Sequence, residues 1–249
     1  MRRNPISVDL NCDVGEGLGN EEALFPHLSS CSIACGGHAG DRRTMGEIAR
    51  LSKAFGIRAG AHPSYPDREH FGRRSLSLTP AELRESLSGQ IRLLEEAAAG
   101  AGIRLRHIKA HGALYNDLAA DPGLGEQYLN ILEPFKSSYI LYVPFGSRFA
   151  KTAELSGFRV WQEGFADRAY RDDGSLVSRT SPGAVLHEPE KVFDQVRQMV
   201  REHTVTTSNN RVIPLRPETV CIHGDNAEAL RILAYLTLKL PDAGIRKST

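Results

Sequence analysis

Apolar, β-branched runs alternate with segments of helical periodicity along almost the whole chain of 249 residues. Strands that alternate with helices are typical of right-handed β-α-β units and a parallel sheet. Seven such units follow one another without an obvious linker, which favours an α/β, TIM-like (β/α)7 barrel in a single domain, residues 1–249, over an open doubly wound sheet. The expected strands are 5–12, 31–37, 57–62, 104–111, 137–146, 158–165 and 218–225.

The helical segments carry start and stop signals. Thr79 as N-cap, Pro80 at the first helical position and Glu82 three residues after the cap predict the start of a long helix within 78–102. Gly56 is a suitable C-cap for the helix before it. The expected helices are 44–56, 78–102, 121–135, 147–157, 188–203 and 226–244.

Polar and charged residues gather where the expected strands end, whereas the strand starts are comparatively bland. In a parallel barrel the active site forms at those carboxyl ends, from the loops that lead into the helices. The chain therefore predicts one shared site. The clusters are "DLNCDVGEG", "IACGGHAGD", "AGAHPSYPDREHFGRR", "IKAHGALYND", "VWQEGFADR" and "VCIHGDN".

Two of these clusters carry the strongest signal. Period-two alternation places Asn11 and Asp13 on one face of the first strand. Lys109 and His111 are also two residues apart, and a lysine that points into a barrel must meet an anion or take part in catalysis, because its desolvation is costly. The side chains that we expect to be catalytic are Asp13, His62, Lys109, His111, Glu163 and Asp167.

The remaining polar residues of the strand ends suggest binding. We expect contacts with substrate or phosphate from Asn11, His38, Arg68, Arg168, Arg179 and Asp225. Mg²⁺ or another divalent cation is also expected, with Asp13, His62 and His223 as candidate ligands. No single motif has a diagnostic ligand spacing, since the chain contains no HExxH and no GxSxG. Solvated turns and helix caps, for example at Asp41 and Asn226, are the structural alternatives.

Charge and composition exclude several classes of function. The net charge of +1, with acids and bases interspersed, argues against a nucleic-acid surface. No apolar run approaches the roughly 20 residues that span a bilayer, and the start "MRRNPISVDLNCD" lacks the apolar region of a signal peptide. The four cysteines form neither a CxxC pair nor a zinc knuckle. Reduced thiols in a cytoplasmic protein are therefore expected.

With these motifs in order, the chain resembles the LamB/YcsF family nearly end to end. The resemblance rests on "DLNCDVGEG", "SIACGGHAGD", "GAHPSYPDREHFGRR", "HIKAHGALYN", "EGFADRAYRDDGSLVSR" and "VCIHGD". Gly37 replaces a customary aromatic residue and Ala110 a customary proline, but both changes leave the charged residues in place. The segment 203–218 matches no family motif.

The resemblance implies a distorted barrel of the glycoside hydrolase/deacetylase type. It also implies ATP-dependent cleavage of the lactam of 5-oxo-L-proline to L-glutamate, with ATP as co-substrate and two further subunits, of B and C type, as partners. In this hypothesis Lys109 and Arg168 meet anionic groups, while carboxylates and histidines of the site act as bases, proton carriers or metal ligands.

Two other functions stay open at this stage. A stand-alone, metal-dependent deacetylase-type hydrolase would act on an amide or sugar without ATP. A non-catalytic binding subunit would not need converging charges. The sequence leaves the oligomeric state undecided, a homo-oligomer included.

Overall fold

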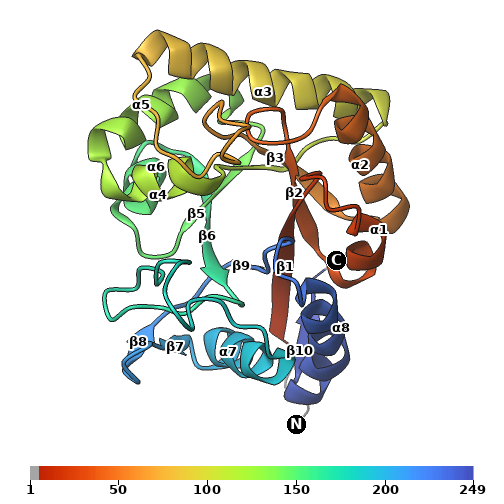
Figure 1. Cartoon of the computed structure of the whole chain (residues 1–249), viewed down its shortest axis with the longest axis vertical. Coiled ribbons are helices and arrows are strands. Elements are labelled where there is room, and N and C mark those ends of the chain that lie inside the picture. The colour runs from red at the N-terminus through yellow and green to blue at the C-terminus, as the bar shows by residue number, and fades with distance from the viewer. Residues whose placement is uncertain (1–5, 249) are drawn as a thin grey trace.

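The computed structural model describes residues 6–248, and its centre is a closed barrel of parallel strands (Figure 1). Each strand from β1 to β6 pairs with the next one along the chain, and β9 pairs with both β6 and β1. The predicted seven-stranded barrel is thus confirmed, although Pro5 of the first predicted strand lies outside the described residues. The barrel strands are β1 (Ile6–Val14), β2 (Ser30–Ala34), β3 (Arg58–His62), β4 (His107–Lys109), β5 (Ile140–Pro144), β6 (Arg159–Phe165) and β9 (Thr219–Cys221).

Two features distort the barrel. A further strand, β10 (Ile245–Lys247), pairs in parallel with the first residues of β1, before β1 turns to β9 as its neighbour. The ladder between β3 and β4 consists of the single pair Ala61 and Ile108. The shortest ladder of the barrel therefore joins two strands that both end in predicted site residues.

Helices cover the outside of the barrel (Figure 1). The capping box of the long helix is confirmed, because Thr79 and Glu82 bond each other's backbone. Asp41 caps α2 by accepting from the amide of Thr44, and Gly56 ends that helix at φ +66°. The main helices are α2 (Arg42–Phe55), α3 (Pro80–Gly100), α4 (Gly112–Ala120), α5 (Pro122–Leu132), α6 (Arg148–Leu155), α7 (Pro189–Arg201) and α8 (Ala229–Lys239).

Several short elements were not predicted from the sequence. α4 begins directly after His111, whereas the sequence predicted the next helix only from residue 121. Gly112 makes this early start feasible, because at φ +59° it turns the chain sharply out of β4. The other unpredicted elements are α1 (Glu21–Leu24), η1 (Phe25–His27), β10, and the antiparallel hairpin of β7 (Thr204–Thr206) and β8 (Val212–Pro214). The predicted helices 121–135 and 226–244 end in short 3₁₀ turns, η2 (Glu133–Phe135) and η3 (Leu240–Ala243).

The cysteines and the helices bear on two further predictions from the sequence, reduced thiols and the lack of a membrane span. All four cysteines are buried and free, as expected for reduced thiols. Within residues 6–248, no helix combines the length and apolar character needed to cross a bilayer.

Stacked aromatic rings fill part of the barrel interior. The ring of His107 stacks on that of Tyr142, with centroids 4.0 Å apart, and Tyr142 stacks in turn on Trp161. Gly60 of β3 lies against this stack. A Cβ atom on Gly60 would lie 2.3 Å from His107 Cδ2, so only glycine leaves room for the ring.

A Gly60→Ala substitution is therefore expected to destabilise the fold by about 1–3 kcal/mol, the usual cost of overpacking a core. Urea unfolding followed by circular dichroism measures the effect. Gly89→Ala is the matched control, because Gly89 lies in the middle of α3 and an added Cβ meets nothing within 4 Å. The control is expected to gain about 0.5–1 kcal/mol from the better helix propensity of alanine. Equal stabilities of the two variants would contradict this packing.

Candidate active site

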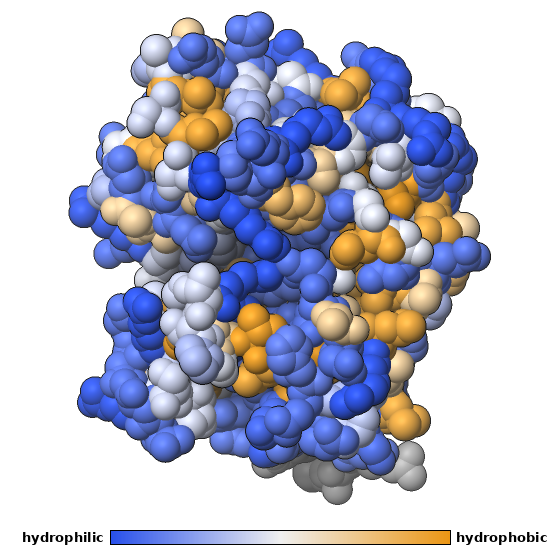
Figure 2. Space-filling view, viewed as in Figure 1, coloured by the Kyte–Doolittle hydropathy of each residue, from blue (hydrophilic) through white to orange (hydrophobic). Residues whose placement is uncertain are grey.

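A cavity of about 520 Å³ opens at the carboxyl ends of the barrel strands. α4, the loop between β3 and α3, and the long loop between β6 and α7 contribute to its lining. Hydrophilic residues dominate this face, which is hollowed between the region of α4 and the loop after β6 (Figure 2). Charged side chains from separate strand ends thus meet in one cavity. The predicted site residues that line it are Asp13, His62, Lys109, His111, Arg168, Arg179, His223 and Asp225.

Lys109 lies deep in this cavity between two carboxylates. Its Nζ lies 2.9 Å from Asp13 Oδ1 and 2.9 Å from Glu163 Oε1, and only 3% of the residue is exposed. Burial alone would lower the pKa of Lys109, but Asp13 and, less strongly, Glu163 raise that pKa well above its ordinary value of 10.5. Lys109 is therefore a fixed cation at neutral pH and not a proton acceptor.

Asp13 is the counter-ion of Lys109 and also faces His62, whose Nε2 lies 3.4 Å from Asp13 Oδ2. Burial alone would raise the pKa of Asp13, yet His62 and Lys109 hold that pKa well below its ordinary value of 3.8. Asp13 is thus an ionised carboxylate that can accept hydrogen bonds from a bound water or substrate.

Glu163 and Asn11 support Lys109 without lining the cavity. Asn11 Nδ2 donates to Glu163 Oε1 at 2.9 Å, and the hydroxyl of Tyr115 donates to Glu163 Oε2 at 2.8 Å. Asn11 Nδ2 also reaches Thr219 Oγ1 at 2.7 Å. Each oxygen of this buried carboxylate has a donor, so the side chain of Glu163 is held in place beneath the cavity floor.

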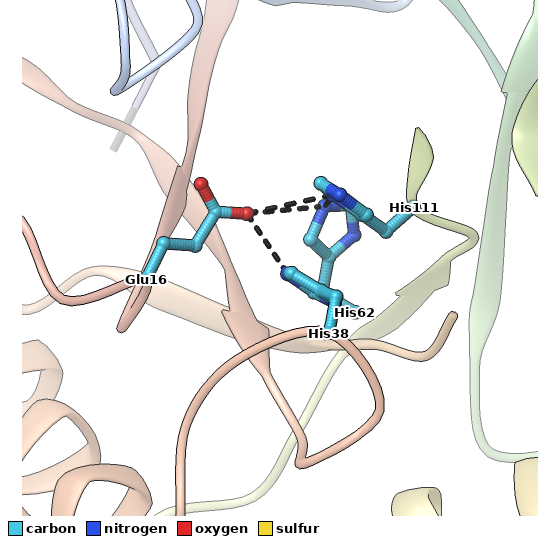
Figure 3. A group of neighbouring side chains, drawn as sticks. All are labelled: Glu16, His38, His62 and His111. Atoms are coloured by element: carbon cyan, nitrogen blue, oxygen red, sulfur yellow. Dashed lines mark hydrogen bonds and ion pairs between the residues drawn. The ribbon is translucent and has the colours of Figure 1, made fainter. Parts of the chain in front are cut away.

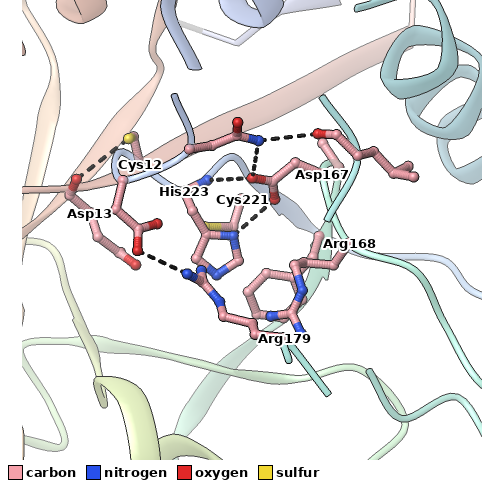
Figure 4. A network of polar contacts seen from close by, with 12 residues as sticks. Cys12, Asp13, Asp167, Arg168, Arg179, Cys221 and His223 are labelled. Carbon is pink, nitrogen blue, oxygen red and sulfur yellow. Dashed lines mark hydrogen bonds and ion pairs between the residues drawn. The ribbon is translucent and has the colours of Figure 1, made fainter. Parts of the chain in front are cut away.

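Asp167 orients His223 at the edge of the cavity (Figure 4). Its Oδ1 lies 2.8 Å from His223 Nδ1, and its Oδ2 accepts from the backbone amide of His223 and from Asn226 Nδ2 at 3.0 Å. Because a carboxylate only accepts, His223 Nδ1 carries a proton and Nε2 is left for the cavity. Asp167 is fully buried, so it positions His223 and does not itself reach the cavity.

Two arginines meet one carboxylate at the cavity wall. Arg179 Nη1 donates to Asp225 Oδ2 at 2.8 Å, and Arg73 pairs with the same oxygen. These residues come from three different loops, after β6, β3 and β9. Arg168 donates to two backbone carbonyls of the loop after β6 and thereby fixes that loop.

Three histidines and Glu16 form a compact group at the cavity wall, and all of them except His38 line the cavity (Figure 3). His38, His62 and His111 follow β2, β3 and β4, and Glu16 follows β1. Burial lowers the pKa of His38 to about 2 and that of His111 well below its ordinary value, so both rings are neutral. Burial, together with the nearby charge of Asp13, raises the pKa of Glu16 to about 7.

The structure separates some predicted site residues from the rest. Arg68 donates to the backbone carbonyls of Gly36 and Gly40 and does not line the cavity. His38 is buried behind the cavity wall, stacked on His111 with ring centroids 3.6 Å apart. Of the three predicted metal ligands, Asp13 and His62 lie together, whereas His223 is bonded to Asp167 and lies outside the group of Glu16 and the three histidines.

Sequence reasoning missed other members of the site. Glu16 lies in a stretch noted for its acidic residues, but its reach to the histidines depends on the turn at Gly15, with φ +74°. Tyr115 and Asn226 read as helix-start residues, and their bonds to Glu163 and Asp167 span 48 and 59 residues. Such long-range bonds leave no local signal in the sequence.

Comparison with known proteins agrees with this architecture. The family model described as "LamB/YcsF family" matches residues 8–249. A curated protein of Thermococcus onnurineus, named as the A subunit of 5-oxoprolinase, is 42% identical over 245 residues, which cover 96% of this chain and 96% of that protein. The crystal structure of the lactam utilization protein from Thermus thermophilus superposes with a TM-score of 0.91 at 33% identity, covering 97% of this chain and 99% of that one.

A more distant likeness concerns the fold alone. The structure titled "T48 deacetylase with substrate" has a TM-score of 0.50 at 14% identity, and it covers 98% of this chain and 88% of that one. The expected deacetylase-like barrel is thus confirmed. The match of the family model and the identity to curated relatives, both over nearly the full length, show that this chain belongs to the LamB/YcsF family.

Proposed function

We propose that this chain is the A-type component of an ATP-dependent 5-oxoprolinase, which cleaves the lactam of 5-oxo-L-proline to L-glutamate as ATP is hydrolysed. Relatives about 40% identical carry the name of that 5-oxoprolinase component. The observation that carries the proposal is the cavity at the strand ends, where a buried lysine, ionised carboxylates and oriented histidines converge. ATP is the proposed co-substrate, and the B- and C-type subunits are the proposed partners.

The residue types suit this chemistry. A five-membered lactam resists water, since its amide is resonance-stabilised and its ring readily re-forms. Phosphorylation of the amide oxygen by ATP would make its carbon a better electrophile, and fixed charges are the main means by which proteins stabilise such a step. Lys109 would stabilise negative charge on the reacting oxygens. Asp13 would accept a hydrogen bond from the attacking water, and His223 would accept or deliver a proton at the ring that opens.

The two arginines at Asp225 are the proposed anchor for the substrate carboxylate. Arginine pairs with carboxylates through two parallel hydrogen bonds, and Arg73 and Arg179 both face the cavity. In the structure the carboxylate of Asp225 pairs with both arginines, as a substrate carboxylate would. A substrate carboxylate would therefore compete with Asp225 for these two side chains.

Arg179→Gln is accordingly expected to raise KM for 5-oxoproline about 10–100-fold, the value of one charge-assisted hydrogen bond, with a smaller change in kcat. Steady-state kinetics of the three-subunit complex measure both constants. Arg171→Gln is the matched control, because Arg171 is an exposed arginine of the same loop. An unchanged KM for Arg179→Gln would exclude this anchor.

The whole proposal is tested by reconstitution. The purified chain is mixed with the B- and C-type subunits from the same source, and glutamate release from 5-oxoproline is measured with and without ATP. Release that needs this chain and ATP together is expected. If the partner subunits release glutamate equally well without this chain, or if ATP has no effect, the proposal fails.

The group of Glu16 and three histidines favours one second candidate, a metal-dependent hydrolase that acts without ATP. It predicts that the isolated chain, loaded with a divalent metal, hydrolyses an N-acetyl or lactam substrate in the absence of nucleotide. An isolated chain that is inactive on such substrates but active in the complex with ATP would decide for the first function.

A further inference from the structure

Four side chains from four successive strand ends each direct one potential metal-ligand atom toward a common point (Figure 3). Glu16 Oε1 lies 3.0 Å from His38 Nε2, 3.5 Å from His111 Nδ1 and 4.0 Å from His62 Nε2. All four donor atoms lie within 4.8 Å of one another. Ligand atoms around a tetrahedral metal with bonds of about 2.0–2.1 Å are separated by about 3.3 Å. Shifts of less than about 1 Å in these side chains would therefore bring all four atoms to that spacing around a metal ion.

The hydrogen bonds on the far sides of two rings fix where their protons are. His62 Nδ1 lies 2.9 Å from the carbonyl oxygen of Lys109, and His111 Nε2 lies 2.9 Å from the carbonyl oxygen of Phe71. A carbonyl oxygen can only accept, so both of these ring nitrogens carry hydrogen. A backbone carbonyl behind the ring is also the usual outer partner of a metal-bound histidine.

If both rings are neutral, two lone pairs face each other. In a neutral imidazole the second nitrogen has no hydrogen, and here these are His62 Nε2 and His111 Nδ1. The two atoms lie only 3.0 Å apart. Two acceptors at this distance repel each other unless a positive charge lies between or beside them. A metal ion supplies that charge, and a shared proton is the alternative.

His38 adds an independent observation. It is buried, its Nε2 faces Glu16, and its Nδ1 has no hydrogen-bond partner among residues 6–248. Parallel stacking on His111, with an interplanar angle of 3°, holds its ring in place. Stacking, and not hydrogen bonds at both nitrogens, thus fixes this buried imidazole and aims it at a carboxylate. It is therefore suited to serve as a third nitrogen ligand.

From this geometry we infer that Glu16, His38, His62 and His111 bind one divalent transition-metal ion of the zinc class. Three imidazoles and one carboxylate suit zinc, cobalt or nickel, whereas magnesium prefers oxygen ligands and bound water. The inferred ligands therefore differ from the set that the sequence suggested, and so does the preferred metal. The binding is a property of the chain itself and does not rest on lactam cleavage.

The test uses the full chain, stripped of metal with a chelator and then titrated with Co²⁺, Zn²⁺ or Mg²⁺ in the absence of ATP and substrate. Bound metal is counted by elemental analysis after gel filtration, and Co²⁺ coordination is read from its visible absorption. We expect one equivalent of Zn²⁺ or Co²⁺, the intense Co²⁺ bands of a four-coordinate site with nitrogen ligands, and far weaker Mg²⁺ binding.

Glu16→Gln and His111→Gln are each expected to weaken metal binding at least tenfold. The two variants alter different ligands, a carboxylate and an imidazole, so one remains informative if the other does not fold. Circular dichroism checks the folding of both. His27→Gln is the matched control, because the His27 ring bonds Thr237 and lies outside the group. It should bind like the wild type.

Three results would overturn the inference. They are the absence of stoichiometric binding by the wild type, unchanged affinity in a folded Glu16→Gln or His111→Gln variant, and Mg²⁺ binding as tight as Zn²⁺ binding. The first would favour a proton shared between His62 and His111. Glutamate release by the three-subunit complex is measured separately, so a failure of this inference leaves the test of the proposed function intact.

Discussion

A Lys109→Met variant is expected to lose activity in the three-subunit complex by about 10²–10³-fold, the usual cost of removing a fixed group that stabilises charge in a transition state. Methionine keeps the length and apolar stem of the side chain, so the cavity changes little in shape. The ammonium disappears, however, and with it the positive charge that Asp13 and Glu163 share. Initial rates of glutamate release at saturating ATP and 5-oxoproline measure the effect.

The same variant should also be less stable, because Lys109 has a second role as the partner of buried carboxylates in the fold. Removing one partner of a buried ion pair leaves an unpaired charge and costs about 3–5 kcal/mol. The double variant Lys109→Met/Glu163→Gln should regain part of that stability, because it removes one of the two stranded carboxylates, but none of the activity. Lys151→Met, on the exposed surface of α6, is the control for loss of a lysine. Full activity of Lys109→Met would remove Lys109 from the proposed mechanism.

Asp167→Asn is expected to lower kcat by about 10²-fold or more while the fold persists. An asparagine at this position can turn its oxygen toward His223 Nδ1, but its NH₂ group then faces two donors, the amide of His223 and Asn226 Nδ2. If it turns the other way, His223 loses its acceptor. Either orientation disturbs the proton arrangement of His223.

The pH dependence of stability offers a second readout for this variant. Burial alone would raise the pKa of Asp167, but His223 and Asn226 hold that pKa below its ordinary value of 3.8. A carboxyl group whose folded-state pKa is lowered stabilises the fold above its unfolded pKa of about 3.9 and loses that contribution as the pH falls through the folded-state pKa. The advantage of the wild type over Asp167→Asn should therefore be larger at about pH 5 than at about pH 3, because it shrinks as the pH falls toward the folded-state pKa.

Urea unfolding at both pH values checks this expectation. Asp242→Asn, at an exposed residue of η3, should track the wild type throughout. A stability difference between wild type and Asp167→Asn that does not change with pH would show that the Asp167 carboxylate is not selectively stabilised by His223 and Asn226. In that case the loss of kcat would need another explanation.

Sequence reasoning predicted at which end of the barrel the charged residues gather, but not how they are arranged there. Period-two alternation correctly put Asn11 and Asp13 on one face of β1, yet it could not show that only Asp13 reaches the cavity. The reason is that height within a barrel depends on strand tilt and register, which neighbouring strands set. Likewise Glu163, at the end of a predicted strand, has its charge buried beneath Lys109 instead of exposed to the cavity.

The arrangement of the histidines shows the same limit most clearly. His62 and His111 are 49 positions apart, and the nitrogen that each presents to the other is chosen by carbonyls of Lys109 and Phe71. A sequence records that histidines follow strands. It does not record which nitrogen carries the proton, because that depends on backbone atoms brought near by the closed barrel.

The sequence by itself therefore determined the alternation of strands and helices, the parallel barrel, and the end of the barrel at which charged residues would meet. These follow from local periodicity and from the geometry that β-α-β units share. Only the tertiary structure decided that Lys109 is a paired cation, that Glu16 joins three histidines, and that Arg73 and Arg179 meet at Asp225. Such pairings depend on distances between loops far apart in the chain, and no local pattern encodes those distances.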